Sequence, residues 1–227
     1  RVMTPPPKGD LPRPDEGAIL AARRRTAETG LPFGAHAENA SIVDAATAAL
    51  KQRGRTDPAA PSEARPSLAE VESIARLIRF ARATRCRLHI YHLTTAEGVE
   101  LVRQAKADGL PVTAETCPHY LLLTQKDLVR LGPVAKCNPP LRTEEDVAAL
   151  WNGVEDGTID ILASDHAPQG LASKNHPVIW DNASGICGIQ LFLPLMLNQV
   201  VSGRLSLERL VRLTAEQPAR HYGLYPR

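Results

Sequence analysis

Apolar and polar positions along the chain follow two patterns, one helical and one extended. Apolar residues three or four positions apart mark the helical stretches, and Gly30, Gly109 and Gly157 stand where three of these stretches stop. The predicted helices are residues 15–29, 41–52, 67–82, 96–107, 125–131, 143–155, 189–201 and 206–215. Short apolar runs of strand length lie between them, at residues 32–36, 87–93, 111–115 and 159–163.

Local signals set the boundaries of these elements. Ser67 and Glu70 have capping-box spacing, which predicts that Ser67 opens the helix 67–82. The Pro-rich opening, residues 4–10, can be neither helix nor central strand, because proline lacks an N–H donor and fixes φ. We expect loops at 53–66 and 168–184 and a brief extended piece at 134–137.

Strands that alternate with helices of this length predict an α/β protein with a parallel sheet. Two architectures compete, a (β/α) barrel and an open doubly wound sheet. The open sheet usually carries a Gly-rich first turn, and neither GxGxxG nor a P-loop occurs here. Polar residues at the C-terminal ends of several strands favour the TIM-type barrel. The strands are fewer than the eight of a complete barrel, so we expect residues 1–227 to form one partial barrel domain.

Composition narrows the class of protein. The chain is 43% hydrophobic and 23% charged, as soluble globular proteins are. Its net charge of +2, with both signs interspersed, argues against a nucleic-acid-binding surface. The four cysteines form no CxxC pair, which favours a reducing compartment. No leader or membrane-spanning run is evident, so we expect a cytoplasmic protein without nucleic-acid or membrane partners.

Three predicted strands end in potential metal ligands, His36, His92 and Asp165. Two neutral imidazoles and a carboxylate suit zinc or a similar divalent ion, and we expect the three side chains to converge around a cation. A single histidine can equally be a hydrogen-bonded structural residue. Because side chains alternate along a strand, His89 should face away from His92 and be a packed or outer-face residue. Asn138, in an extended loop, could bond a ligand or cap a turn.

Several short motifs carry a family resemblance. They are HAEN at 36–39, Arg65-Pro66 followed by Glu70, YHLT at 91–94, ETCPHYL at 115–121, NPPLR at 138–142 and SDHAP at 164–168. In this order, and across nearly the whole chain, they resemble the cyclic amidohydrolases, the group of allantoinases, hydantoinases (dihydropyrimidinases) and dihydroorotases.

The resemblance implies a barrel with a metal centre, usually of two zinc ions, that hydrolyses a small cyclic amide. His36 and His92 match the histidines that hold the second metal, and Asp165 matches the aspartate that binds the first. Asp165 would also take a proton from the attacking water and return it to the leaving ring nitrogen. Asn138 matches a position that holds the cyclic amide. The resemblance also implies a homo-oligomer, a dimer or tetramer.

The chain departs from the family at both ends. The family carries a His-x-His on its first strand, and none lies upstream of His36. The bridging carbamylated lysine would fall near Arg1, whose guanidinium stays charged and cannot be carbamylated. The family's small β-sandwich is also missing. We therefore expect the N- and C-terminal parts of the family's chain to be absent.

Three alternatives stay open. The first is a metal-free or truncated relative that acts as a scaffold or binding module, and the second is a hydrolase with one metal held by His36, His92 and Asp165. The third is a dihydroorotase, although those enzymes tend to carry a histidine where Gln169 stands. The HAEN motif and residues 86–89 and 135–137 look most like allantoinases.

Overall fold

The sheet of this protein is parallel throughout. A computed structural model describes residues 2–4 and 14–226, and Arg1, near which the lysine was expected, lies outside them. Within these residues the strands form a five-stranded sheet in the order of the sequence, with every neighbouring pair parallel. The strands are β1 Val2–Thr4, β2 Phe33–Ala37, β3 Leu88–Ile90, β4 Val112–Thr116 and β5 Ile161–Leu162. Sequential parallel order is that of a (β/α) barrel, which confirms the predicted class.

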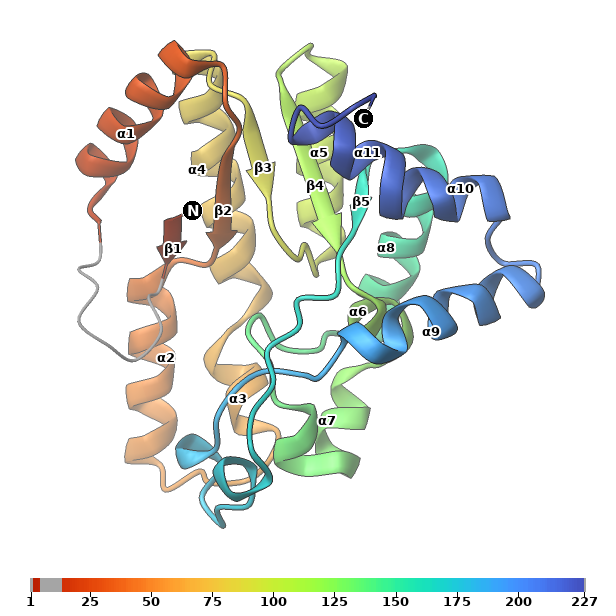
Figure 1. Cartoon of the computed structure of the whole chain (residues 1–227). Coiled ribbons are helices and arrows are strands. Elements are labelled where there is room, and N and C mark those ends of the chain that lie inside the picture. The colour runs from red at the N-terminus through yellow and green to blue at the C-terminus, as the bar shows by residue number, and fades with distance from the viewer. Residues whose placement is uncertain (1, 5–13, 227) are drawn as a thin grey trace.

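Helices occupy every crossover between the strands (Figure 1). The first three crossovers contain α1 Glu16–Thr29, then α2 Ala40–Gln52, α3 Ala60–Ala64 and α4 Ser67–Thr84, then α5 Ala96–Ala107. The fourth contains α6 Pro118–Leu122, α7 Gln125–Leu131, the 3-10 turn η1 Gly132–Ala135 and α8 Glu144–Asp156. After β5 come η2 Leu171–Lys174, η3 Ile179–Asp181, α9 Ile189–Val201, α10 Leu207–Val211, the π-helical turn η4 Arg212–Glu216 and α11 Gln217–His221.

The helix predictions at 96–107, 125–131 and 189–201 are confirmed to the residue. Three other expectations were wrong. The loop 53–66 contains α3, whose first turn accepts Pro61 because that position needs no N–H donor. Residues 132–135 form η1 where an extended piece was expected at 134–137. The last helical region continues past residue 215 through η4 into α11.

The prediction of a capping box at α4 was also wrong. Pro66 occupies the N-cap position, and no side chain caps the helix. Glu70 is instead buried and accepts hydrogen bonds from the chain that follows β3. The Glu70 carboxylate could either cap its own helix or bond a distant segment of the chain. In the structure it bonds the distant segment.

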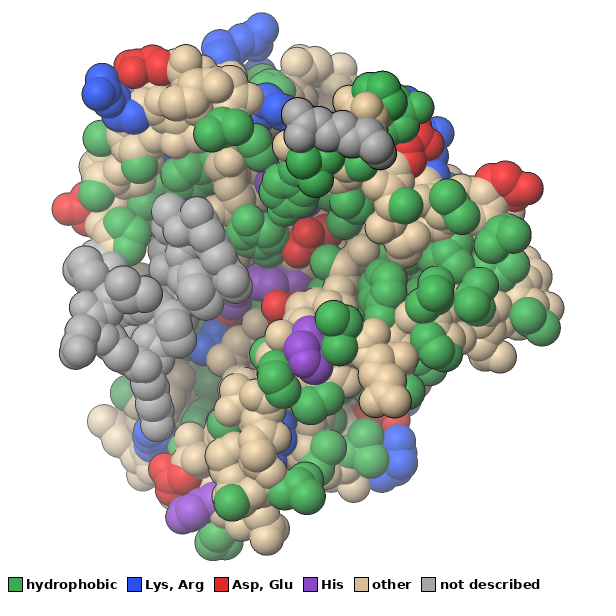
Figure 2. Space-filling model, viewed as in Figure 1, with side chains coloured by type: hydrophobic (Ala, Val, Ile, Leu, Met, Phe, Trp, Pro, Cys, Tyr) green, Lys and Arg blue, Asp and Glu red, His purple; other side chains and the backbone are tan. Residues whose placement is uncertain are grey.

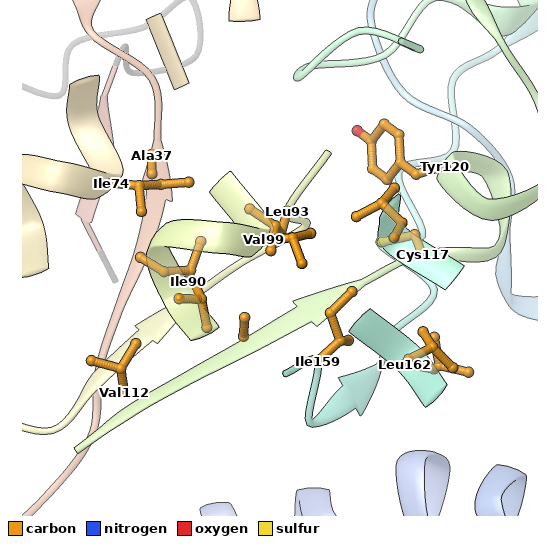
Figure 3. Close-up of a cluster of buried hydrophobic side chains, with 14 of the residues drawn as sticks. Ala37, Ile74, Ile90, Leu93, Val99, Val112, Cys117, Tyr120, Ile159 and Leu162 are labelled. Carbon is orange, nitrogen blue, oxygen red and sulfur yellow. The ribbon is translucent and has the colours of Figure 1, made fainter. Parts of the chain in front are cut away.

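One face of the sheet packs against the helices and forms the hydrophobic core. Ile90 on β3, Ile74 of α4 and Val99 of α5 belong to this core cluster, and each of the three is at most 1% exposed (Figure 3). Trp151 of α8 is 2% exposed, and its indole N–H donates to the carbonyl of Leu121 over 2.8 Å. This packing fixes the strands and therefore the positions of the residues at their ends.

The opposite face of the sheet is polar. The strand register aligns Gly34 with His89 and His89 with Thr113, so these three positions share the face away from the core residues Ala35 and Ile90. His36, two residues after Gly34, lies on the same face. His89 is fully buried, as predicted for a packed residue, and it bonds Thr113 on this inner face.

Helix α9 is apolar on its outer side as well as on its core side. Met196 is buried, whereas Ile189, Leu191 and Val201 are 65%, 55% and 86% exposed. Figure 2 shows apolar side chains gathered over α9 and α10 on this face of the molecule. In the described ranges, none of the helices combines the length and the apolar character needed to cross a membrane.

Candidate active site

Two histidines meet at the carboxyl ends of neighbouring strands. His36 lies near the end of β2 and His92 two residues beyond β3, and they are 4% and 3% exposed. The Nδ1 atom of His36 lies 2.9 Å from Nε2 of His92. The rings are arranged edge to face, with centroids 4.6 Å apart. The structure therefore brings these two predicted ligands together.

The backbone explains how His92 reaches His36. His92 has a φ of 34°, in the left-handed region that residues other than glycine seldom adopt. Strand β3 ends at Ile90, earlier than the predicted residue 93, and the turned backbone at His92 interrupts the alternation of side chains. The prediction that His89 and His92 face opposite sides by simple alternation is therefore replaced by a turned His92 whose ring contacts His36.

Asp165 also sits in an unusual backbone conformation, with a φ of 41°. It follows β5 and is partly exposed. Burial raises the pKa of the Cys117 thiol well above its usual value, and the charge of Asp165 adds to that rise. The same two causes, with further contributions, raise the pKa of the buried Tyr120. Asp165 therefore lies beside the residues that follow β4.

The expected convergence of His36, His92 and Asp165 is not seen as a single cluster. Throughout residues 2–4 and 14–226, no group of three or more His, Cys, Asp or Glu side chains is placed to hold one metal ion. His36 and His92 follow adjacent strands, and Asp165 follows β5, so the three residues come from three strands of the sheet.

A carboxylate lies behind His36. Oε2 of Glu38 is 2.8 Å from Nε2 of His36 and also accepts a hydrogen bond from Arg65. Glu38 is fully buried. Burial raises the pKa of its carboxyl group, but the charge of Arg65 and the hydrogen bond with His36 outweigh burial, and the net pKa is lowered.

The histidine pair fits a divalent metal. When Nε2 of His36 donates to the Glu38 carboxylate, its Nδ1 has a lone pair, and this atom faces Nε2 of His92. A histidine whose other nitrogen is held by a carboxylate is the usual arrangement of a metal ligand. The pair supplies two imidazole donors, and the remaining donors of a complete site are not grouped with it.

A second buried carboxylate fixes the chain just after His92. Glu70 is 2% exposed and accepts from the backbone N–H groups of Thr94 and Thr95 over 2.8 and 3.2 Å. Arg142 donates to the same carboxylate over 3.3 Å and to the Thr94 hydroxyl over 3.0 Å. The loop after β3 is therefore tied both to α4 and to the loop before α8.

A cleft of about 640 Å³ is lined in part by Arg65, which donates to Glu38. The cleft is lined by polar side chains from several loops, among them Thr47, Lys51, Arg65, Asn138, Gln169 and Ser184. Asn138, predicted as a substrate-binding residue, is thus placed at a cavity that also contacts the partner of Glu38.

Two close backbone contacts hold the loop that bears Asp165. A Cβ on Gly185 would lie 2.4 Å from the carbonyl oxygen of Ala167, and one on Gly188 would lie 2.6 Å from that of Ser164. Nδ1 of His166 accepts from the N–H of Gly188 over 3.2 Å. The residues after β5 are therefore braced by the start of α9.

Sequence reasoning assigned no role to Glu38, Arg65 or Arg142. All three stand inside motifs that carried the resemblance, so the signal was present. Their role depends on contacts between residues as far apart in sequence as 27 and 72 positions, which a single sequence does not display.

Comparison with known proteins agrees with this fold and site. The sequence profile of the amidohydrolase family matches residues 7–227. The chain is 40% identical over 218 residues to an allantoinase of Enterococcus faecalis, covering 96% of this chain and 48% of the relative. It is 37% identical over 214 residues to an L-hydantoinase of Paenarthrobacter aurescens, covering 93% and 47%.

Solved structures give the same result. The structure of the L-hydantoinase (dihydropyrimidinase) from Arthrobacter aurescens superposes with a TM-score of 0.95 at 36% identity, covering 99% of this chain and 51% of that one. A D-hydantoinase structure gives a TM-score of 0.92 at 30% identity, covering 99% and 50%. The chain spans about half the length of these relatives and corresponds to part of a TIM-type barrel.

Proposed function

Because this chain belongs to the amidohydrolase family, we propose that the protein hydrolyses a cyclic amide, opening a ring such as that of allantoin, a hydantoin or a dihydropyrimidine. The observation that carries the proposal is the contact of His36 with His92 at the carboxyl ends of β2 and β3. Chemistry in barrels of this kind sits at that edge of the sheet. The allantoinase and hydantoinase names of the relatives support the substrate class.

We propose that His36 and His92 hold one metal of a zinc pair and that Asp165 contributes to the other. Bound zinc would lower the pKa of a coordinated water and polarise the amide carbonyl. Asp165 would take the proton of the attacking water and return it to the ring nitrogen as the C–N bond breaks. Asn138, at the cleft, would hold the ring through its amide.

The lining of the cleft bears on the choice of substrate. Gln169 stands where dihydroorotases tend to carry a histidine for the substrate carboxylate, and it lines the cleft as a neutral amide. Its amide carries no charge, whereas a histidine can become the cation that a substrate carboxylate prefers. This favours allantoin or a hydantoin over dihydroorotate, with dihydroorotase as the alternative.

Replacement of Asp165 tests the reaction. Asp165→Asn retains the size of the side chain and tolerates the left-handed backbone, but it cannot accept the proton. We expect ring opening to fall by about 10²- to 10⁴-fold. Asp160→Asn, at the other end of β5 where Asp160 pairs with Lys106, is the matched control and should leave turnover unchanged. Full activity of Asp165→Asn would exclude the proposed mechanism.

A second candidate function is a scaffold without catalysis. It is favoured by the absence, within residues 2–4 and 14–226, of a three-donor metal group. Metal analysis of the purified intact protein separates the two functions. Stoichiometric zinc supports the hydrolase, and a protein that neither binds zinc nor opens allantoin, a hydantoin, a dihydropyrimidine or dihydroorotate supports the scaffold.

A further inference from the structure

We propose that Glu38 and Arg65 act as a positioning pair that presents Nδ1 of His36 to the metal, so that metal affinity depends on a carboxylate that is not itself a ligand. This inference rests on the proposed function, because it concerns the ligand role of His36. In this proposal Glu38 and Arg65 belong to the metal site because they orient the ligand His36, although neither binds the metal.

The geometry of the three side chains supports this role. A single oxygen of Glu38, Oε2, lies 2.8 Å from Nε2 of His36 and accepts from the Arg65 guanidinium. Glu38 is fully buried, and the Arg65 side chain is 17% exposed. His36 is therefore held through the nitrogen that points away from His92, and rotation of its ring would break the contact with Glu38.

Arg65 is fixed in turn by its surroundings. Its carbonyl oxygen accepts a hydrogen bond from Arg142, which is itself paired with Glu70. The next residue, Pro66, is the N-cap of α4. The Arg65 side chain thus extends from a rigid point in the backbone toward Glu38 on one side and the cleft on the other.

A comparison within the same sheet shows what distinguishes His36. His89 also contacts a carboxylate, with its Nε2 3.0 Å from Oε2 of Glu115. Its other nitrogen, Nδ1, is 2.8 Å from the Thr113 hydroxyl, so both ring nitrogens of His89 are engaged within the sheet. In His36 the second nitrogen faces another imidazole instead. The two pairs share the histidine–carboxylate contact, and only the pair at the strand ends directs a nitrogen toward a second potential ligand.

Glu38→Gln and Arg65→Met test the pair in the intact protein, with Glu115→Gln as the matched control at the other histidine–carboxylate contact. Zinc affinity is measured by competition with a chromophoric chelator. The ring nitrogens of His36 are followed by ¹⁵N NMR in the metal-free protein, and circular dichroism checks that each variant folds.

We expect Glu38→Gln to weaken zinc binding by about 10- to 100-fold and to shift the ¹⁵N signals of His36. Arg65→Met should change both readouts in the same direction, and Glu115→Gln should change neither. Unchanged zinc affinity and unchanged His36 signals in folded Glu38→Gln would overturn the positioning role. A protein that opens no cyclic amide but whose His36 signals depend on Glu38 would instead overturn the proposed function and leave the pair in place.

Discussion

The buried carboxylate of Glu70 should be a main source of stability. Five donors converge on it: the N–H and hydroxyl groups of Thr94 and Thr95, and the Arg142 guanidinium. Glu70→Gln conserves shape but has one acceptor oxygen in place of two, and its NH₂ group would face donors. A buried donor without an acceptor costs about 1–3 kcal/mol, and a broken buried ion pair costs about 3–5 kcal/mol.

These costs belong to one network and do not add fully. We therefore expect Glu70→Gln to lower the free energy of unfolding by about 3–5 kcal/mol, which corresponds to a melting temperature lower by roughly 10 °C for a chain of this size. Urea denaturation of the intact protein, followed by circular dichroism, measures the change.

Glu144→Gln is the control for this experiment. Glu144 pairs with Lys126 over 2.7 Å, but the two side chains are 69% and 76% exposed. Loss of such a surface pair should cost about 0.5 kcal/mol or less. A loss of under 1 kcal/mol in Glu70→Gln, about that expected of an ordinary surface substitution, would refute the reasoning that the network is important for stability.

Two further predictions concern packing and pH. Gly34→Ala should destabilise the protein by about 1–3 kcal/mol, because its Cβ would lie 2.2 Å from the Tyr91 hydroxyl oxygen; calorimetry that shows an unchanged melting temperature would contradict this. Burial lowers the pKa of His119 to about 4, so the unfolded chain binds a proton that the folded protein does not between pH 6.5 and 4. Stability should therefore be complete above pH 6.5 and fall by about 3 kcal/mol as the pH drops to 4. Urea midpoints of His119→Gln should show a weaker dependence on pH over this range, and an unaltered dependence would count against the assignment.

The fold was predictable because its signals are local. The periodicity of residues 96–107 and 189–201 predicted both ends of α5 and of α9 correctly. Threonine 143, three residues before Asp146, forms the capping box that opens α8. These elements depend on neighbours in the sequence, and the alternation of strand and helix then restricts the topology to a parallel sheet.

The contact between two of the predicted site residues could be anticipated from the sequence, but its geometry could not. His36 and His92 were identified from their places at strand ends, and their contact depends on a left-handed residue that no short-range signal announces at His92. Asp165 was identified in the same way, and its place in a common metal site with the two histidines stays a prediction. For Glu70 the local signal was misleading. Its spacing from Ser67 predicted a helix cap, but the carboxylate accepts hydrogen bonds from residues distant in the sequence.

The left-handed backbone at His92 and Asp165 links the direction of each side chain to a local cost. The conformation costs on the order of 1 kcal/mol in most residues other than glycine, although asparagine, aspartate and histidine adopt it more readily than the rest. A glycine at position 92 would release that cost but would also remove a side chain that is 3% exposed and lies 2.9 Å from Nδ1 of His36. The turn that aims this ring and the ring that fills the space therefore cannot be exchanged separately.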